Sequence, residues 1–201
     1  MVDREFPAKP TQNAEASRQR ILAAALAEFS AYGLAGARMD RIAKRAECNK
    51  NLVYIYFESK ESLFRTVLEN NLARIYKDID FQECDLPRYA GRMFDYAMEN
   101  PDLMRLMAWC GLEGRSSNFA LRSILYEAKL AALSKAQEES RLGQTFSPGF
   151  LLTAIRSLAT SWTAVNPFGS LSDGIDVFTA SELRAHVVEA VRLLTSAGKC
   201  P

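Results

Sequence analysis

Apolar residues recur at helical spacing along most of the chain. Ile21, Ala25 and Phe29 lie four residues apart with Leu22 and Leu26 beside them, which is the apolar stripe of an amphipathic helix. No segment alternates apolar and polar residues with a period of two for long enough to predict a strand. The pattern therefore predicts an all-α chain of about nine helices, over residues 17–33, 39–46, 50–57, 59–79, 87–99, 101–112, 118–139, 148–165 and 179–195.

The pattern also predicts three segments along the chain. Residues 1–16 contain Pro7 and Pro10 and show no periodicity, so they are expected to be a flexible arm that either enters a DNA minor groove or only aids solubility. Residues 17–64 are predicted to form a three-helix domain, and residues 65–201 a larger helical domain. A chain of 201 residues that is 48% hydrophobic has enough apolar material for one or two cores.

The two short helices predicted at 39–46 and 50–57 are too short to be stable alone. A helix-turn-helix explains their length, because its first helix braces the second, which lies in the major groove of DNA. Ile42 and Ala43 are expected to pack the bracing helix. Val53 and Phe57, four residues apart, are expected to form the buried face of the second.

The opposite face of the second helix is predicted to contact DNA. It carries Lys50, Asn51, Ile55 and Tyr56, with Tyr54 at its flank. Tyrosine hydroxyls and a lysine ammonium donate to phosphate oxygens, and Asn and Lys can also pair with adenine and guanine. In the alternative, the tyrosines belong to the core and rim of a helical bundle, and the lysines are ordinary surface charges.

The run from residue 20 to residue 64 resembles the DNA-binding domain of the tetracycline-repressor (TetR) family of bacterial transcriptional regulators. The residues that carry the resemblance are Ile21, Leu22, Ala25, Phe29, Tyr32, Gly33, Ile42, Ala43, Ala46, Val53, Tyr54, Tyr56, Phe57, Ser59, Lys60, Glu61 and Leu63. The resemblance implies a homodimer whose N-terminal domains read a near-palindromic operator in double-stranded DNA. It also implies that Lys50 through Tyr56 form the recognition helix, and that Tyr54 and Lys60 contact phosphates.

Three positions depart from the family's usual residues. Glu47 stands in the turn where the family usually has glycine, so it must adopt a conformation that costs about 1 kcal/mol. Asn49 replaces serine and keeps the helix cap. Arg38 replaces threonine, which removes a cap from the bracing helix but offers another phosphate contact.

The larger domain is rich in methionine and aromatic residues, which suit an adaptable pocket for an apolar or aromatic small-molecule effector. The residues predicted to line such a pocket are Met107, Trp109, Tyr126 and Trp162. Arg105 and Glu113 either supply a polar end to the pocket or are surface charges. The alternative for the whole set is the ordinary core of a helical bundle.

The last two helices are predicted to form a homodimer interface, as a four-helix bundle across a two-fold axis. The residues expected there are Leu152, Ile155, Ala159, Leu183, Val187, Val191 and Leu194. A single histidine, His186, lies one residue off this stripe.

Composition limits the other functions. The 25 basic and 24 acidic side chains nearly balance, although residues 1–60 hold 10 basic and 7 acidic ones. Four cysteines without CxxC spacing and one histidine predict no metal or cofactor. No secretory or membrane-spanning segment is recognised, so we expect a cytoplasmic protein with reduced thiols. Cys48, in the predicted turn, is read as a buried inert thiol rather than a redox switch.

These features predict a ligand-responsive DNA-binding transcriptional regulator, a repressor that a small molecule releases from its operator. One alternative is an architectural or division-control DNA-binding protein that has no inducer. An enzyme is not expected, because the sequence has no GxSxG elbow, P-loop or paired-carboxylate motif.

Overall fold

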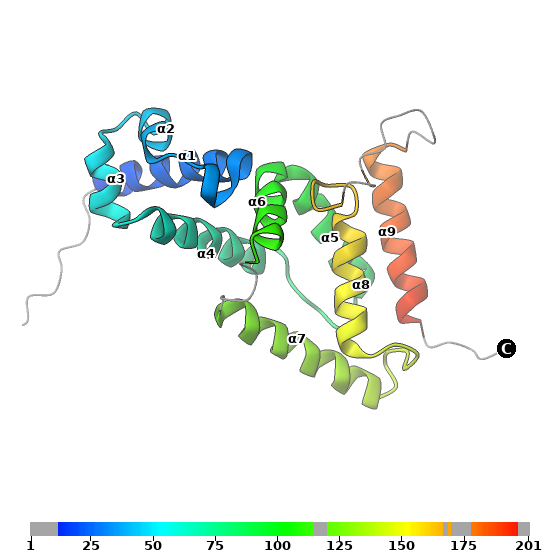
Figure 1. Ribbon diagram of the computed structural model, residues 1–201. Coiled ribbons are helices and arrows are strands. Elements are labelled where there is room, and N and C mark those ends of the chain that lie inside the picture. The colour runs from blue at the N-terminus through cyan, green and yellow to red at the C-terminus, as the bar shows by residue number, and fades with distance from the viewer. Residues whose placement is uncertain (1–11, 115–119, 167–168, 170–177, 197–201) are drawn as a thin grey trace, which may run out of the picture. The chain divides into compact units, whose positions relative to one another are not determined.

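The computed structural model describes residues 12–114, 120–166, 169 and 178–196, and within these residues it contains nine helices and no strand (Figure 1). The all-α prediction is confirmed. The helices are α1 (Gln12–Gly36), α2 (Met39–Arg45), α3 (Lys50–Phe57), α4 (Lys60–Asp78), α5 (Leu86–Glu99), α6 (Pro101–Leu112), α7 (Ala120–Glu138), α8 (Pro148–Thr160) and α9 (Ala180–Thr195).

Two of the predicted boundaries are wrong. Helix α1 begins at Gln12, so residues 12–16 of the expected arm are helical, while residues 1–11 lie outside the described residues. Helix α8 ends at Thr160 and is followed by turns, in which the hydroxyls of Ser161 and Thr163 donate to the carbonyls of Ser157 and Thr160.

Local capping explains why most other boundaries follow from the sequence. Asp85, Ser147 and Thr179 each accept a hydrogen bond from a backbone N–H in the first turn of α5, α8 and α9. Thr179 and Glu182 form a complete capping box. Prolines occupy the first turns of α5, α6 and α8, where no hydrogen bond is lost.

The chain divides into two compact units, Met1–Leu68 and Glu69–Pro201. The sequence places this division four residues earlier, after residue 64. In the first unit, the residues predicted to pack the bracing and second helices are buried: Ile42, Ala43, Val53 and Phe57. The ring of Phe29 on α1 packs edge-on against Phe64, with 5.0 Å between ring centroids. These contacts join α1, α2 and α3 to the start of α4 around one core.

A glycine interrupts α1 at the predicted point. Gly33 has φ 65° and ψ −177°, a backbone conformation that is not helical and that favours glycine. The chain therefore changes direction after Tyr32, and residues 34–37 lead into α2.

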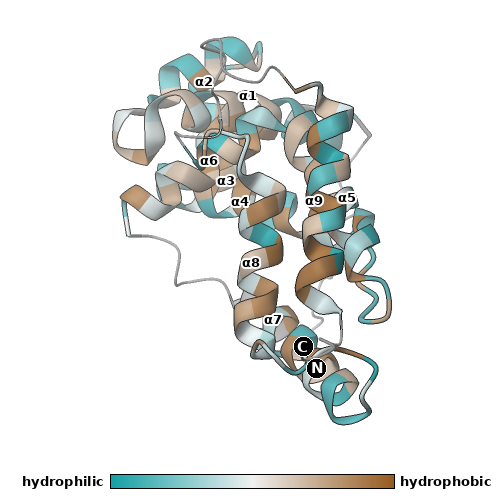
Figure 2. Ribbon diagram, turned by 90° about the vertical axis from the view of Figure 1, so that its right-hand side faces the viewer, coloured by the Kyte–Doolittle hydropathy of each residue, from teal (hydrophilic) through white to brown (hydrophobic). Residues whose placement is uncertain are grey.

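In the second unit, α5 packs against both α8 and α9. Figure 2 shows bands of apolar residues along α8 and α9 between polar positions. Gly91 allows α5 and α9 to approach closely, because a Cβ atom there would lie 3.0 Å from Val188 Cγ2 and 2.9 Å from Arg184 Nη2. The Arg184 guanidinium crosses the same contact to pair with Asp95 on α5 at 2.8 Å. The α5–α9 pair is thus held by close packing and by an ion pair.

The predicted homodimer residues lie elsewhere than expected. Five of the seven are buried in the core of the protomer itself: Leu152, Ile155, Ala159, Val187 and Val191. Leu183 and Leu194 are partly buried against the same core. The apolar stripes of α8 and α9 pack on α5 of the same chain, so the five buried side chains are not available to a second copy. The large apolar side chains that these two helices expose are Phe150 and Leu193, with 52% and 61% of their surface accessible.

None of the helices in the described parts of the chain is long and apolar enough to span a membrane.

Candidate nucleic-acid interface and ligand cavity

The turn between α2 and α3 has the strained backbone expected of a non-glycine residue. Glu47 has φ 53°, in the left-handed region, and this prediction is confirmed. The N–H groups of Glu47 and Cys48 donate to the carbonyls of Lys44 and Ala43 at 3.2 and 3.0 Å, which stabilises the conformation. Asn49 caps α3, because its side-chain oxygen accepts from the N–H of Asn51 at 2.9 Å.

Helix α3 has two distinct faces. Val53 and Phe57 are buried, whereas the side chains of Lys50 and Asn51 are exposed. Tyr54 is 41% exposed and Ile55 is 75% exposed. A large apolar side chain on an otherwise polar face is suited to contact a thymine methyl group in the major groove. The arrangement can therefore both donate to phosphates and touch base edges.

Lys50 on the exposed face is paired with a carboxylate of α2. Its Nζ lies 2.5 Å from Asp40 Oδ1, and both side chains are largely solvent-exposed. The hydrogen bond and charge of Lys50 lower the pKa of Asp40, and those of Asp40 raise the pKa of Lys50. Both groups are thus charged at neutral pH. The lysine expected to contact DNA is partly neutralised by its own bracing helix.

Two of the predicted DNA contacts are turned back onto α1 and the residue that follows it. The half-buried Tyr56 donates its hydroxyl hydrogen to the carbonyl of Ala14 at 3.1 Å. The ammonium of Lys60 donates to the carbonyls of Ala37 and Ala35 at 3.2 and 3.4 Å. The single donor of Tyr56 is occupied, so a phosphate would have to replace its bond, whereas the ammonium of Lys60 keeps one of its three N–H groups for a phosphate.

Arg38 is exposed at the start of α2 and makes no side-chain cap, as its replacement of threonine predicts. The cap comes instead from Glu28 on α1, which is 5% exposed. Its Oε1 accepts from the backbone N–H of Arg38 at 2.9 Å and from Arg41 Nε at 2.6 Å. The Arg41 guanidinium also lies over the Tyr32 ring, 4.2 Å from its centroid. This carboxylate fixes the corner between α1 and α2.

This network does not follow from the sequence patterns. The available signal was Glu28 itself, an acidic residue next to Phe29 on the apolar stripe of α1. A carboxylate buried in that position needs a partner.

The second unit contains a cavity of about 290 Å³. Its walls come from α4 to α8, and they are mainly apolar and aromatic. Of the four predicted pocket residues, Met107 and Tyr126 line the cavity. Trp109 and Trp162 do not. The Trp162 ring packs edge-on against Phe94, with 6.1 Å between centroids, as part of the core.

The polar residues of the cavity differ from those suggested by the sequence. Arg105 is exposed, forms an ion pair with Asp102, and does not line the cavity, and Glu113 does not line it either. The charged groups that do are Lys129 on α7 and Arg156 on α8. Lys129 follows Tyr126 by three residues, which places both on one face of α7, and this spacing was the signal available.

Lys129 is held among aromatic rings. Its Nζ donates to the hydroxyl of Tyr89 at 2.8 Å and lies 4.8, 5.1 and 5.2 Å from the ring centroids of Tyr89, Phe81 and Tyr76. Burial first, and then the charge of Arg156, lower the pKa of Lys129 to about 8. Burial raises the pKa of Tyr89 to about 12, so this phenol stays protonated.

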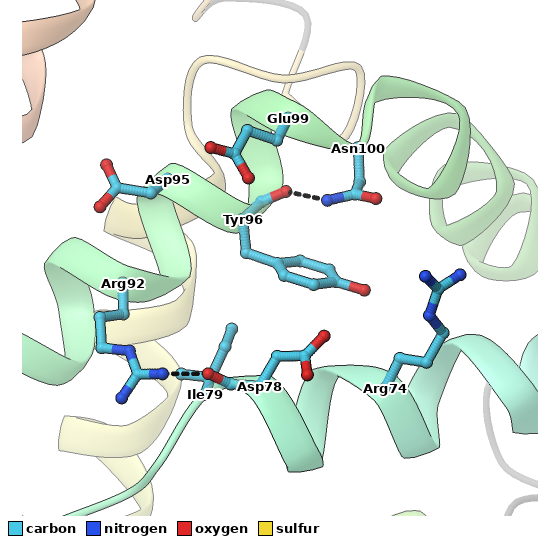
Figure 3. A pocket seen from close by; sticks show the side chains of 8 residues that line it. All are labelled: Arg74, Asp78, Ile79, Arg92, Asp95, Tyr96, Glu99 and Asn100. Carbon is cyan, nitrogen blue, oxygen red and sulfur yellow. Dashed lines mark hydrogen bonds between the residues drawn. The ribbon is translucent and has the colours of Figure 1, made fainter.

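A second hollow, of about 390 Å³, is polar and open. Figure 3 shows Arg74 and Asp78 of α4 facing Tyr96 of α5 and its neighbours. Arg92 donates to the backbone carbonyl of Asp78, and Asn100 donates to that of Tyr96 at 2.8 Å. Arginines and carboxylates both line this hollow, which makes it a poor match for an apolar ligand.

Comparison with known proteins supports the same division of the chain. Residues 21–67 match the family described as bacterial regulatory proteins, tetR family, and residues 85–192 match the tetracyclin repressor-like C-terminal domain. The chain is 35% identical over 156 residues to the HTH-type transcriptional repressor SCO4008 of Streptomyces coelicolor, an alignment that covers 76% of this chain and 81% of that protein.

Two further similarities extend this result. The chain is 33% identical over 128 residues to the HTH-type transcriptional repressor NicS of Pseudomonas putida, covering 58% and 60% of the two chains. The solved structure of SCO4942 from Streptomyces coelicolor superposes with a TM-score of 0.79 at 35% identity, covering 90% of this chain and 99% of that one.

The helix-turn-helix with its exposed α3 face, followed by an all-helical unit, defines a DNA-binding regulator of transcription. The chain belongs to the TetR family, since the match to the C-terminal domain alone spans more than half of its 201 residues.

Proposed function

We propose that the protein is a repressor that binds a near-palindromic operator as a homodimer and is released by a small molecule. The observation that carries this proposal is the two-faced α3, which presents Lys50, Asn51, Tyr54 and Ile55 over a buried face. The relatives SCO4008 and NicS are both named repressors, which supports repression over activation.

In this proposal each protomer places α3 in a major groove. The two half-sites then lie one helical turn, roughly 34–36 Å, or a multiple of it apart. Asn51 and Ile55 read bases, while Tyr54 and Lys50 contact phosphates. Arg38, exposed beside the N-terminus of α2, adds a further phosphate contact.

Dimerisation is assigned to the outward faces of α8 and α9. The buried stripes of these helices are used within the protomer, so the contact must come from residues such as Phe150 and Leu193. The two side chains belong to the same end of the helix pair, because the N–H of Gly143, shortly before α8, donates to the carbonyl of Thr195 at the end of α9 at 3.2 Å. Leu193→Glu tests this surface without disturbing the core.

The cavity provides the site of release. A ligand can shift the protein away from its DNA-binding shape only by its difference in affinity for the two shapes. Ligand and operator must then weaken each other's binding by the same factor. Equal operator affinity with and without saturating ligand would exclude release by that compound.

Sequence-specific DNA binding is tested by selecting the duplexes that the protein retains from a random pool. The selection is done at about 150 mM salt, where non-specific phosphate binding is weakened. A palindrome with half-sites one turn apart is the expected result. The matched control is the double variant Asn51→Ala, Ile55→Ala, which keeps the buried face of α3 and should retain DNA without that motif. Retention by the unaltered protein without any motif would instead favour an architectural DNA-binding protein.

A further inference from the structure

We infer that the cavity of the second unit binds a small amphipathic carboxylate, an acid with one aromatic ring system or a short alkyl chain. This inference rests on the proposed function only in that the bound acid would be the releasing signal. It is carried by the juxtaposition of Lys129 and Arg156 in a cavity that is otherwise apolar.

The charge of the cavity has one sign. Lys129 and Arg156 both line it, and none of the lining residues that the structure describes is acidic. Within the described parts of the chain, neither cation forms an ion pair with a carboxylate. Two like charges that are partly removed from water raise the free energy of the empty cavity. An anion would offset that cost, whereas a cation would add to it.

The hydrogen-bond geometry is also suited to an anion. The Tyr89 oxygen accepts from Lys129, so its own hydroxyl hydrogen remains to be donated to a ligand oxygen. Arg156 lies over the Tyr126 ring, 5.7 Å from the centroid, and its guanidinium can bind a carboxylate through two parallel N–H groups. Lys129, Tyr89 and Arg156 together supply the donors that a carboxylate requires.

The remaining walls set the size and nature of the ligand. Met93, Met104 and Met107 contribute flexible apolar surface that adapts to flat or curved ligands. A volume of about 290 Å³ is at the lower end for ligand pockets, which favours a small ligand. A singly charged carboxylate also loses less hydration on entry than a doubly charged phosphate monoester.

Direct calorimetric binding with matched pairs tests the inference: 1-naphthoate against 1-naphthalenemethanol, and octanoate against octanol. The members of each pair differ only in the charged group. We expect each acid to bind about 10- to 100-fold more tightly than its alcohol. This is the gain in affinity that a charge-assisted hydrogen bond provides. Equal affinities within both pairs would overturn the inference.

Variants assign the effect to the two cations. Lys129→Met and Arg156→Met should each reduce the preference for the acid, and Lys129→Arg should restore most of it. Arg105→Met is the matched control, because Arg105 is exposed outside the cavity. Thermal unfolding checks that each variant is folded. An unchanged preference in both folded Met variants would also overturn the inference.

The calorimetric measurements use no DNA, so they test the chemistry of the cavity separately from the proposed function. If the acids bind and operator affinity does not change, the cavity chemistry stands and release by these acids is wrong. If neutral compounds release the operator and the acids do not bind, release stands and the carboxylate assignment is wrong.

Discussion

Asp40 on α2 holds Lys50 on α3 in an ion pair, with 2.5 Å between Oδ1 and Nζ. Asp40→Asn frees this lysine for a phosphate and removes a negative charge beside the proposed DNA surface. We expect operator affinity to rise about two- to tenfold at low salt. The slope of log affinity against log salt should steepen by about 1.8, because each protomer of the proposed dimer gains one phosphate contact. Fluorescence anisotropy over a salt series measures both. Glu138→Gln, outside the DNA-binding unit, should change neither, and unchanged affinity in Asp40→Asn would contradict the prediction.

Tyr54 and Ile55 are neighbours with different expected roles. Tyr54→Phe removes a donor to phosphate. It should therefore lower the affinity for operator and for random DNA by a similar factor, about three- to tenfold. Ile55→Ala removes an apolar base contact, so it should lower the operator affinity and leave the affinity for random DNA nearly unchanged. Competition with random duplex separates the two effects. The same selectivity loss in both variants would show that Tyr54 also reads bases.

The buried carboxylate of Glu28 is expected to stabilise the first unit. Glu28→Gln leaves Arg41 without its charge partner, which should lower the free energy of unfolding by about 1–3 kcal/mol. Urea denaturation followed by circular dichroism measures the change. Glu61→Gln, at an exposed position of α4, should cost less than about 0.5 kcal/mol. Equal stability of the two variants would contradict the role given to Glu28.

Lys129 should make stability depend on pH in the alkaline range. Its pKa is about 8 in the folded protein against an ordinary value of 10.5, so the unfolded chain holds its proton longer. Below pH 8 the protonated Lys129 therefore lowers the free energy of unfolding. This loss is progressively removed as the pH rises from 8 to 10.5.

The comparison that isolates this effect is with Lys129→Met. Between pH 7.5 and 10, wild-type stability should rise relative to the variant by about 1–2 kcal/mol, after allowance for screening of a partly exposed group. The groups that face the ammonium are Arg156, Tyr76 and Tyr89, all of which the variant keeps. A constant difference across this range would mean that Lys129 titrates normally.

The cysteines should differ in reactivity. Cys48 is half-buried and burial raises the pKa of its thiol, whereas Cys84 is exposed. Iodoacetamide at pH 7.5 should therefore alkylate Cys84 well before Cys48, as peptide mapping by mass spectrometry would show. Alkylation of Cys48 at the rate of Cys84, together with loss of DNA binding, would support a redox switch.

The first unit was largely predictable because its signals are local. The bounds of α3, the cap at Asn49 and the strained Glu47 depend on residues adjacent in sequence. The side-chain partners of Tyr56 and Lys60 did not follow, because they lie 42 and 23 residues away along the chain. Periodicity shows that a side chain faces inward and does not show which group it meets.

The second unit shows the same limit more strongly. The stripes of Ile155 and Val191 were recognised as apolar contact surfaces, but whether they meet α5 or a second copy depends on helix packing. The cavity combines α4 to α8, so the sequence around Trp109 offered Arg105 and Glu113 either as a polar end or as surface charges and did not indicate Lys129. The spacing of Tyr126 and Lys129 places both on one face of α7, but it does not show whether that face meets a cavity or solvent.

The bonds from Arg38 and Arg41 to Glu28 close loops of only 10 and 13 residues. Loops of this length close in roughly 10–100 ns and cost little chain entropy. The corner between α1 and α2 can therefore form during synthesis, before the residues that line the cavity have been translated. A nascent or truncated chain that ends after the first unit would be able to fold its DNA-reading helix while lacking the site that responds to the ligand.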